Sequence, residues 1–176
     1  MAVKRLKANS KGEPRLLPTH NDLAADVRHA VVALLQPRLA DAVDLHWQAK
    51  QAHWNVKGPN FIGLHELFDR VAEAVDEWAD LLAERIVQLG GIAEGTIQVA
   101  AGRSALPDYP LHATDWAEHV EAVSQSLSSF GQAVRQAIGQ TSELGDQDTA
   151  DICTEISRAV DKMLWFVEAH GQGNGQ

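Results

Sequence analysis

The 176-residue sequence has almost no cysteine and no long apolar run. A single cysteine, Cys153, excludes an internal disulfide framework and a metal site built from cysteines. No apolar stretch approaches the ~20 residues that cross a bilayer, and the mean hydropathy is −0.21. The N-terminus is basic, but it lacks the ~7–15-residue apolar segment of a secretory signal. We therefore expect a cytoplasmic protein without a membrane segment.

The composition is that of a globular chain, with 45% hydrophobic and 22% charged residues. Its length suits one domain. The net charge of −9 is unevenly distributed, because the first 15 residues hold one acidic and five basic side chains. These basic residues are Lys4, Arg5, Lys7, Lys11 and Arg15. We expect residues 1–19 to form a flexible arm that binds DNA without sequence preference, unless this arm only aids solubility.

The first half of the domain, 20–170, is expected to hold two long helices. The first begins at the N-cap candidates Asn21 and Asp22 and ends near Val56, and Pro37 should kink or divide it. A turn over 57–60 follows, with Asn60 expected to cap the next helix. That second helix covers about 61–89 and ends at a pair of glycines.

The second half begins with a long crossover over about 91–113, with room for one short helix near 96–101. Asp115 and Glu118 predict a capping box for a helix over about 115–138. A polar turn over 141–148 then precedes a last helix that ends near 170, before a frayed tail over 171–176. Strand-like alternation, phosphate-binding glycine loops and internal repeats are missing. The expected fold is therefore all-α, a ferritin-like four-helix bundle with a long crossover between its second and third long helices.

The second helix carries the candidate chemistry. Its apolar residues recur at three- and four-residue steps and form a seam. A polar row runs beside the seam and comprises His65, Asp69, Glu73, Asp76, Asp80 and Glu84. Within this row His65 and Asp69 are four residues apart, as are Asp80 and Glu84, so each pair can converge on one cation. Imidazole and carboxylate without thiolate suit iron, manganese or zinc.

One helix cannot bring the two pairs to one metal, because Asp69 and Asp80 are separated by about 16 Å of helix rise. The pairs lie symmetrically about the point between Ala74 and Val75. Two copies of the helix that cross antiparallel at that point would place each pair opposite the other and build two identical sites. His53, near the end of the first helix, can add a further ligand. The competing interpretation is a solvated acidic face; a site inside one bundle would instead need Glu-x-x-His motifs, which this sequence lacks.

These residues resemble the Dps family, the DNA-protection-during-starvation mini-ferritins. The resemblance spans roughly 20–170 and includes the segments Lys50–Gly58, Ala83–Arg85, Gln88–Gly91, Tyr109–Leu111, Thr149–Ile152, Asp161–Lys162 and Leu164–Phe166. Its most specific element is the spacing His-x11-His-x3-Asp-x10-Asp-x3-Glu, whose members are His53, His65, Asp69, Asp80 and Glu84.

The resemblance implies a hollow twelve-subunit shell that oxidises Fe(II), preferably with hydrogen peroxide, and stores Fe(III) mineral. It places His53, His65 and Asp69 of one subunit and Asp80 and Glu84 of its two-fold mate around two irons, for which other divalent metals can substitute. All five act as metal ligands and catalytic residues. The resemblance also implies that Asp146, Asp148 and Asp151 line acidic pores, although acids at a helix N-terminus also simply oppose its dipole.

Two further residues lie beside the predicted site. Trp54 follows His53 and either absorbs stray oxidising equivalents or only packs. Lys50 lies one turn before His53, where it either pairs with a site carboxylate or is solvated. Two other functions stay open: a nucleoid-associated binding protein whose metal only fastens the dimer, and a dimeric helical bundle without a cavity.

Overall fold

The computed structural model describes residues 16–172, and these residues form five helices and no strand. The long helices are α1 (Ala25–Asn55), α2 (Phe61–Gln88), α4 (Trp116–Glu143) and α5 (Gln147–Glu168), and α3 (Ile97–Arg103) is short. None of the described helices is long and apolar enough to cross a membrane. The predicted all-α four-helix bundle is confirmed.

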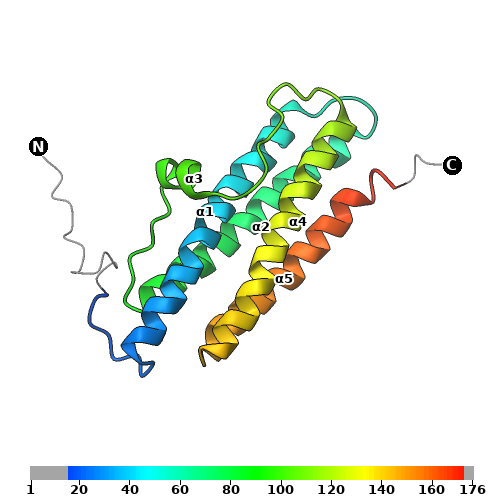
Figure 1. The fold of residues 1–176 in the computed structure, drawn as a ribbon. Coiled ribbons are helices and arrows are strands. Elements are labelled where there is room, and N and C mark those ends of the chain that lie inside the picture. Colours follow the sequence, from blue (N-terminus) through cyan, green and yellow to red (C-terminus); the bar gives the residue numbers. More distant parts are fainter. Residues whose placement is uncertain (1–15, 173–176) are drawn as a thin grey trace, which may run out of the picture.

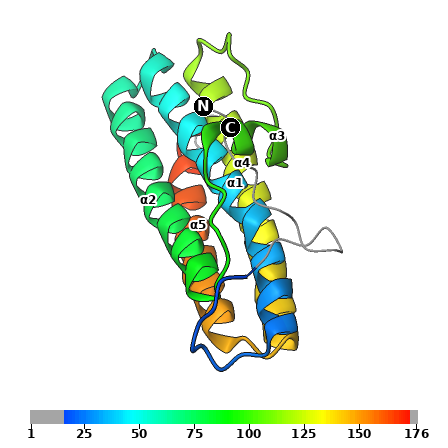
Figure 2. The ribbon, with the colours of Figure 1, turned by 90° about the vertical axis from the view of Figure 1, so that its left-hand side faces the viewer.

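The long helices pack side by side in two antiparallel hairpins, α1 with α2 and α4 with α5 (Figure 1). The crossover between α2 and α4 carries the chain back along the whole length of the bundle, and α3 lies in it against α1 (Figures 1 and 2). The α1–α2 turn therefore lies at one end of the molecule, and the α4–α5 turn lies at the other.

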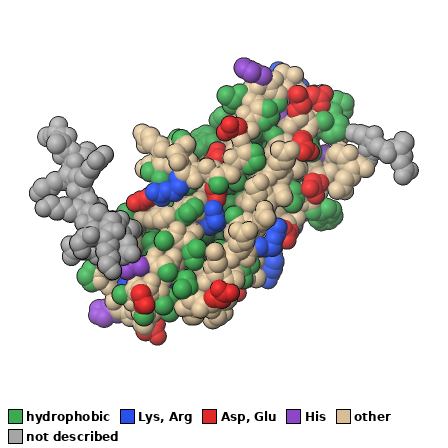
Figure 3. All heavy atoms as spheres, in the orientation of Figure 1, with side chains coloured by type: hydrophobic (Ala, Val, Ile, Leu, Met, Phe, Trp, Pro, Cys, Tyr) green, Lys and Arg blue, Asp and Glu red, His purple; other side chains and the backbone are tan. Residues whose placement is uncertain are grey.

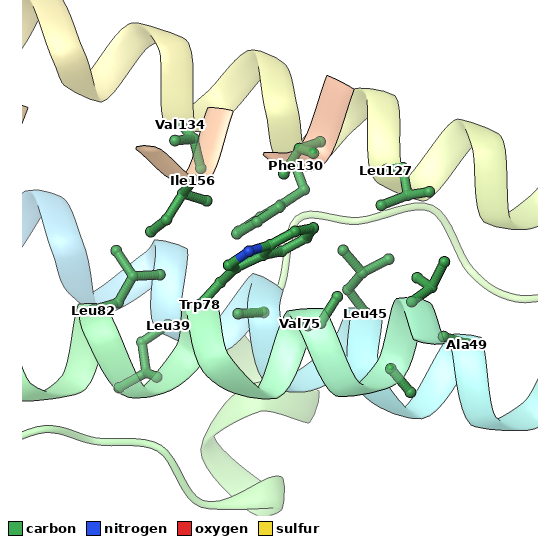
Figure 4. Packing of buried hydrophobic residues seen from close by; sticks show 14 of the residues in the cluster. Leu39, Leu45, Ala49, Val75, Trp78, Leu82, Leu127, Phe130, Val134 and Ile156 are labelled. Atoms are coloured by element: carbon green, nitrogen blue, oxygen red, sulfur yellow. The ribbon is translucent and has the colours of Figure 1, made fainter. Parts of the chain in front are cut away.

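The core follows the apolar seams of the four long helices. Trp78 of α2 is 4% exposed and stacks on Phe130 of α4 with ring centroids 6.1 Å apart. Leu39 and Leu45 of α1 and Ile156 of α5 belong to the same cluster (Figure 4). Because the α2 seam is buried against the other helices, the polar row beside it is held at the edge of the bundle.

The starts of the first two long helices differ from the expectations. The first helix begins at Ala25, because the Asn21 side chain accepts from the Leu23 main-chain N–H instead of capping the helix. Asn60 does occupy the N-cap position of α2, but it has a left-handed backbone (φ 63°) and its side chain makes no capping bond. Pro37 does not divide α1, which is continuous through it.

The predicted start of the third long helix is confirmed, and its end lies further along the chain than predicted. The capping box of Asp115 and Glu118 is present. The helix continues to Glu143, and Thr141, expected in the polar turn, lies buried inside it with its hydroxyl donating to the Ala137 carbonyl at 2.7 Å. The chain turns only at Gly145, whose φ of +83° lies in the left-handed region that glycine adopts without strain.

The segment before α1 is fixed against the end of α2. The Leu17 main-chain N–H donates to the Gly90 carbonyl at 2.7 Å, and the Arg28 side chain donates to the Leu89 carbonyl. Gly90 has φ +85°, and a Cβ there would lie 2.6 Å from the Leu17 carbonyl oxygen. The turn therefore requires glycine at this position. The five basic residues expected to bind DNA lie outside the described residues, as does 173–176 of the expected tail.

Candidate metal centre

Two histidines face each other where α1 ends and α2 begins. His53 Nδ1 lies 2.7 Å from the main-chain carbonyl of His65, and His65 Nδ1 lies 2.8 Å from the main-chain carbonyl of His53. The rings stack with centroids 3.8 Å apart and an interplanar angle of 21°. This reciprocal bonding fixes both rings across the α1–α2 turn.

The bonding also determines which ring nitrogens are available. A carbonyl oxygen only accepts, so each Nδ1 must carry the proton. In the neutral tautomer each Nε2 then has a free lone pair, which is the usual arrangement for a metal-binding histidine held by a backbone carbonyl. The pair therefore presents two imidazole ligands whose orientation is set before any metal arrives.

Asp69 lies next to these histidines and is held by a lysine. Lys50 Nζ is 2.5 Å from Asp69 Oδ1, and His53 Nδ1 is 4.0 Å from the same oxygen. The hydrogen bond from Lys50 is the main cause that lowers the pKa of Asp69 below 3.8, against a smaller opposing effect of burial. The predicted pairing of Lys50 with a site carboxylate is thus present, and Asp69 is an ionised ligand candidate.

Asp80 and Glu84 lie about three turns further along α2. Both are exposed, and neither makes a hydrogen bond or ion pair with any residue in 16–172. Asp80 lines a depression of about 600 Å³ between α1, α2 and the crossover, together with Leu39, Val43 and Ala93. No hydrogen bond or ion pair within residues 16–172 therefore fixes the orientation of these two carboxylates.

The structure thus brings together three of the five predicted ligands and leaves two apart. His53, His65 and Asp69 lie at one end of α2, and Asp80 and Glu84 lie toward the other. Within residues 16–172, no group of three or more His, Cys, Asp and Glu side chains is arranged to hold a metal ion. One subunit alone does not complete the centre.

Trp54 is the outermost of the residues predicted beside the site. It is 57% exposed, and the Lys50 ammonium lies 5.9 Å from its ring centroid. Its ring centroid is also 6.2 Å from that of Trp47. Within the subunit Trp54 is therefore not buried in the core, and Lys50 links it to Asp69.

The three acidic residues at the start of α5 have different surroundings. Asp146 is 2% exposed, caps α5 and pairs with Arg85 of α2 at 2.7 Å. Asp148 and Asp151 are exposed. Because its carboxylate is bonded inside the subunit, Asp146 is a poor candidate for a pore lining, and the pore remains a prediction for the other two.

Sequence reasoning missed two buried polar contacts. Arg85 pairs with Asp146 and donates to the Thr149 hydroxyl at 2.8 Å, which ties α2 to α5. The Tyr109 hydroxyl lies 2.6 Å from Nδ1 of the buried His119. A charged residue on the buried side of the α2 seam was an available signal for Arg85. No sequence pattern indicates the second contact.

Known proteins share this fold and part of this sequence. The ferritin-like domain family matches residues 32–172. The chain is 42% identical to the DNA protection during starvation protein of Agrobacterium fabrum, over 88% of this chain and 95% of that protein. Among solved structures, Dps of Mycobacterium smegmatis (tetragonal form) superposes with a TM-score of 0.82 and 33% identity, covering 88% of this chain and 94% of that one. Dps of Microbacterium arborescens in its high iron form gives 0.79 and 32%, covering 88% and 98%.

Proposed function

The chain belongs to the Dps family of ferritin-like proteins, and from this membership we propose that it is an iron-storing ferroxidase that protects DNA. It oxidises Fe(II) with hydrogen peroxide at sites shared between subunits and keeps the Fe(III) as mineral inside a hollow shell of twelve subunits. A similar protein has been solved in a high iron form, which supports iron as the substrate.

The observation that carries the proposal is the incomplete centre at each end of α2. His53, His65 and Asp69 are organised within the subunit, whereas Asp80 and Glu84 are exposed and unpartnered among the described residues. Two copies of α2 that cross antiparallel about a two-fold axis would bring the second pair of one subunit to the first group of its mate. Each dimer then has two sites, and each site holds two irons.

The donor set suits the reaction. Two imidazole nitrogens and three carboxylates are ligands that bind Fe(II), and other divalent metals can occupy such a site. So few protein ligands leave positions on the metals where peroxide binds. Reduction of one peroxide to two waters takes two electrons and two protons, and each of two Fe(II) ions supplies one electron. A pair of irons therefore consumes the oxidant without releasing hydroxyl radical.

Mixing two defective variants tests the shared site. His65→Ala and Asp80→Asn/Glu84→Gln are purified separately, unfolded, mixed and reassembled. A heterodimer has one site with both defects and one site with neither. Random mixing therefore leaves about a quarter of the sites intact, by the two-fold symmetry of the pair. We expect peroxide-dependent Fe(II) oxidation to return to about that fraction.

Each variant reassembled alone is the matched control and should stay inactive. If the mixture is no more active than its components, the site does not span two subunits. Static binding of iron without turnover in the wild type would instead favour a binding protein whose metal only fastens the dimer.

The assembly is supported by apolar side chains that one subunit leaves uncovered. On α1, on α3 and in the crossover, Trp47 is 45% exposed, Trp54 57%, Ile97 61% and Leu111 70%. Exposed apolar residues gathered in this way are typical of subunit contacts. Electron microscopy with and without iron should show hollow and mineral-filled shells, and a dimer without a cavity would contradict the proposal.

Entry of Fe(II) is assigned to the acidic pores, with Asp148 and Asp151 as their lining. Both are exposed at the start of α5, and cations are attracted to clustered carboxylates. Replacing both with lysine should slow iron uptake while the assembly stays intact. Unchanged uptake kinetics would exclude this route.

Direct DNA binding is assigned to Lys4, Arg5, Lys7, Lys11 and Arg15. On the face shown in Figure 3, acidic side chains are scattered over the bundle, which offers phosphate no single cationic surface. Contacts from basic arms release counterions and are salt-sensitive, and twelve arms would act together. Deletion of residues 1–15 should abolish the gel shift and with it nucleoid association in the cytoplasm. An undiminished shift would exclude the arm.

A further inference from the structure

The only tyrosine of the chain makes a hydrogen bond to a buried histidine. Tyr109 lies in the crossover and His119 in the first turns of α4, and the Tyr109 hydroxyl is 2.6 Å from His119 Nδ1. His119 is 1% exposed, and its Nε2 is buried without a hydrogen-bond partner among the described residues. Nothing in the proposed ferroxidase chemistry uses this pair.

The surroundings make His119 a proton acceptor. Burial is the largest influence on His119 and lowers its pKa below 6.5. The ring is thus neutral at neutral pH. With its proton on Nε2, its Nδ1 lone pair accepts the bond from the tyrosine hydroxyl.

Burial also keeps the tyrosine protonated. Desolvation raises the pKa of Tyr109 well above its usual value of 10.0, so the phenolate is not available. Removing an electron from a neutral phenol makes its proton strongly acidic, and that proton must move at the same time. His119 Nδ1 lies at the place where the proton has to go.

Two indoles lie close to the same tyrosine. Trp47, Trp54 and Tyr109 line one pocket of about 440 Å³ on the surface between α1, α3 and the crossover. The ring centroids of Trp47 and Trp54 are 6.2 Å apart, and Trp54 directly follows His53. The aromatic side chains therefore connect the candidate metal centre with the tyrosine–histidine pair.

We infer that Tyr109 and His119 form a proton-coupled electron donor that reduces oxidised Trp47 and Trp54. The electron leaves the Tyr109 phenol for the indolyl radical, which takes a proton from water and becomes indole again. The phenol proton moves to His119 Nδ1, and a neutral phenoxyl radical is left on Tyr109. The water that gives up its proton is left as hydroxide, whose charge balances that of the protonated His119, so the step balances in electrons, protons and charge.

The oxidant of the indole is a one-electron species such as hydroxyl radical, formed when peroxide meets a single Fe(II) ion. The protective role of the Tyr109–His119 pair against such radicals rests on the proposed ferroxidase function. The transfer of an electron from Tyr109 to an oxidised indole does not depend on it. The transfer would hold an oxidising equivalent inside the protein until a reductant removes it.

The test uses the full chain without iron, so its outcome is independent of the ferroxidase proposal. Azidyl radicals generated by pulse radiolysis oxidise indole selectively, and the absorption of the indolyl and phenoxyl radicals is followed in time. We expect indolyl absorption to convert to phenoxyl absorption at a rate independent of protein concentration and slower in heavy water. All phenoxyl must come from Tyr109, because the chain has no other tyrosine.

Three variants locate the step. Tyr109→Phe should leave the indolyl radical long-lived, and Trp47→Phe/Trp54→Phe should abolish the fast conversion. His119→Asn keeps an oxygen acceptor near the position of Nδ1 but removes the base, and it should slow phenoxyl formation ~100-fold, within the range for loss of a general base. Thermal denaturation checks that each variant is folded. Phenoxyl formation that is absent in the wild type, or equally fast in folded His119→Asn, would overturn the inference.

Discussion

The two ends of α2 carry predicted metal ligands in different environments. At the first end, His65 and Asp69 are held by His53 and Lys50 through contacts of 2.5–2.8 Å. At the other end, Asp80 and Glu84 make no hydrogen bond or ion pair within residues 16–172. The first end is organised by the subunit itself, whereas the second needs a partner.

The difference is local and depends on which side of the helix a residue occupies. Glu84 is exposed, but the next residue, Arg85, is 5% exposed and bonded to Asp146 and Thr149. A buried charge without a partner would be very costly, so Arg85 is satisfied inside the chain. An exposed carboxylate costs little while it waits for a metal or a second subunit.

The largest effect on stability should come from replacing Arg85, the buried and ion-paired residue near the C-terminal end of α2. Arg85→Met leaves the Asp146 carboxylate buried without its cation, and such a break costs about 3–5 kcal/mol of stability. Chemical denaturation measures it. Glu84→Gln, one residue away, is the matched control and should stay within about 0.5 kcal/mol of the wild type. Equal losses of stability in the two variants would contradict the distinction between the buried, paired Arg85 and the exposed Glu84.

The second largest effect should be a loss of metal affinity when the carboxylates of Asp80 and Glu84 are replaced by amides. Asp80→Asn/Glu84→Gln removes two ligands, which we expect to weaken Co(II) binding by more than about 100-fold, since even supporting residues around a metal contribute 10–100-fold. Calorimetric titration measures the affinity, and the melting temperature should be unchanged. Wild-type affinity in the double variant would mean that the histidine end binds the metal alone.

A smaller change is expected when Lys50 is replaced by methionine. A metal ion that binds Asp69 through Oδ1 competes with the Lys50 ammonium, which contacts the same oxygen. Exposed ion pairs contribute about 0.2–1 kcal/mol, so its removal should tighten Co(II) binding by up to about 5-fold. Arg70→Met, an exposed cation on the same helix with no ion pair among the described residues, is the control. Weaker binding would show that Lys50 helps to place the ligand.

The smallest effect is a difference in pH dependence. Because Lys50 lowers the Asp69 pKa below 3.8, the stabilisation by this pair is present above 3.8 and is lost only as pH falls through the lowered value. Wild type and Lys50→Met should therefore have parallel melting-temperature profiles from neutral pH to about pH 5 and converge only in stronger acid. Convergence already near neutral pH would mean that Asp69 is not held in this way.

The elements of the fold that follow from chain-local patterns could be predicted from the sequence. The α2 seam, the capping box at Asp115, the short helix in the crossover and the bundle itself are of this kind. The predicted end of α4 was wrong, because the helix continues to Glu143 through a segment of polar, turn-like composition in which Thr141 is fully buried. Pro37 was expected to kink or divide α1, and the continuous helix excludes division.

The sequence was sufficient to predict which residues belong to the candidate site, but not the hydrogen bonds that orient their side chains. Spacing along α2 indicates which side chains share a face. It says nothing of the carbonyls of His53 and His65, which fix the two rings only when α1 and α2 pack together. The burial of Asp146 beside Arg85 likewise joins residues 61 positions apart, a contact with no local signature.

The bond between Leu17 and Gly90 sets the point of departure for everything that precedes it in the chain. Leu17, one residue after the described polypeptide begins, lies beside the turn that follows α2. A tail that starts from a fixed anchor reaches only as far as its own length from that point. The anchor therefore fixes the point at which residues 1–15 leave the subunit, and a symmetric assembly would repeat that point once in each subunit.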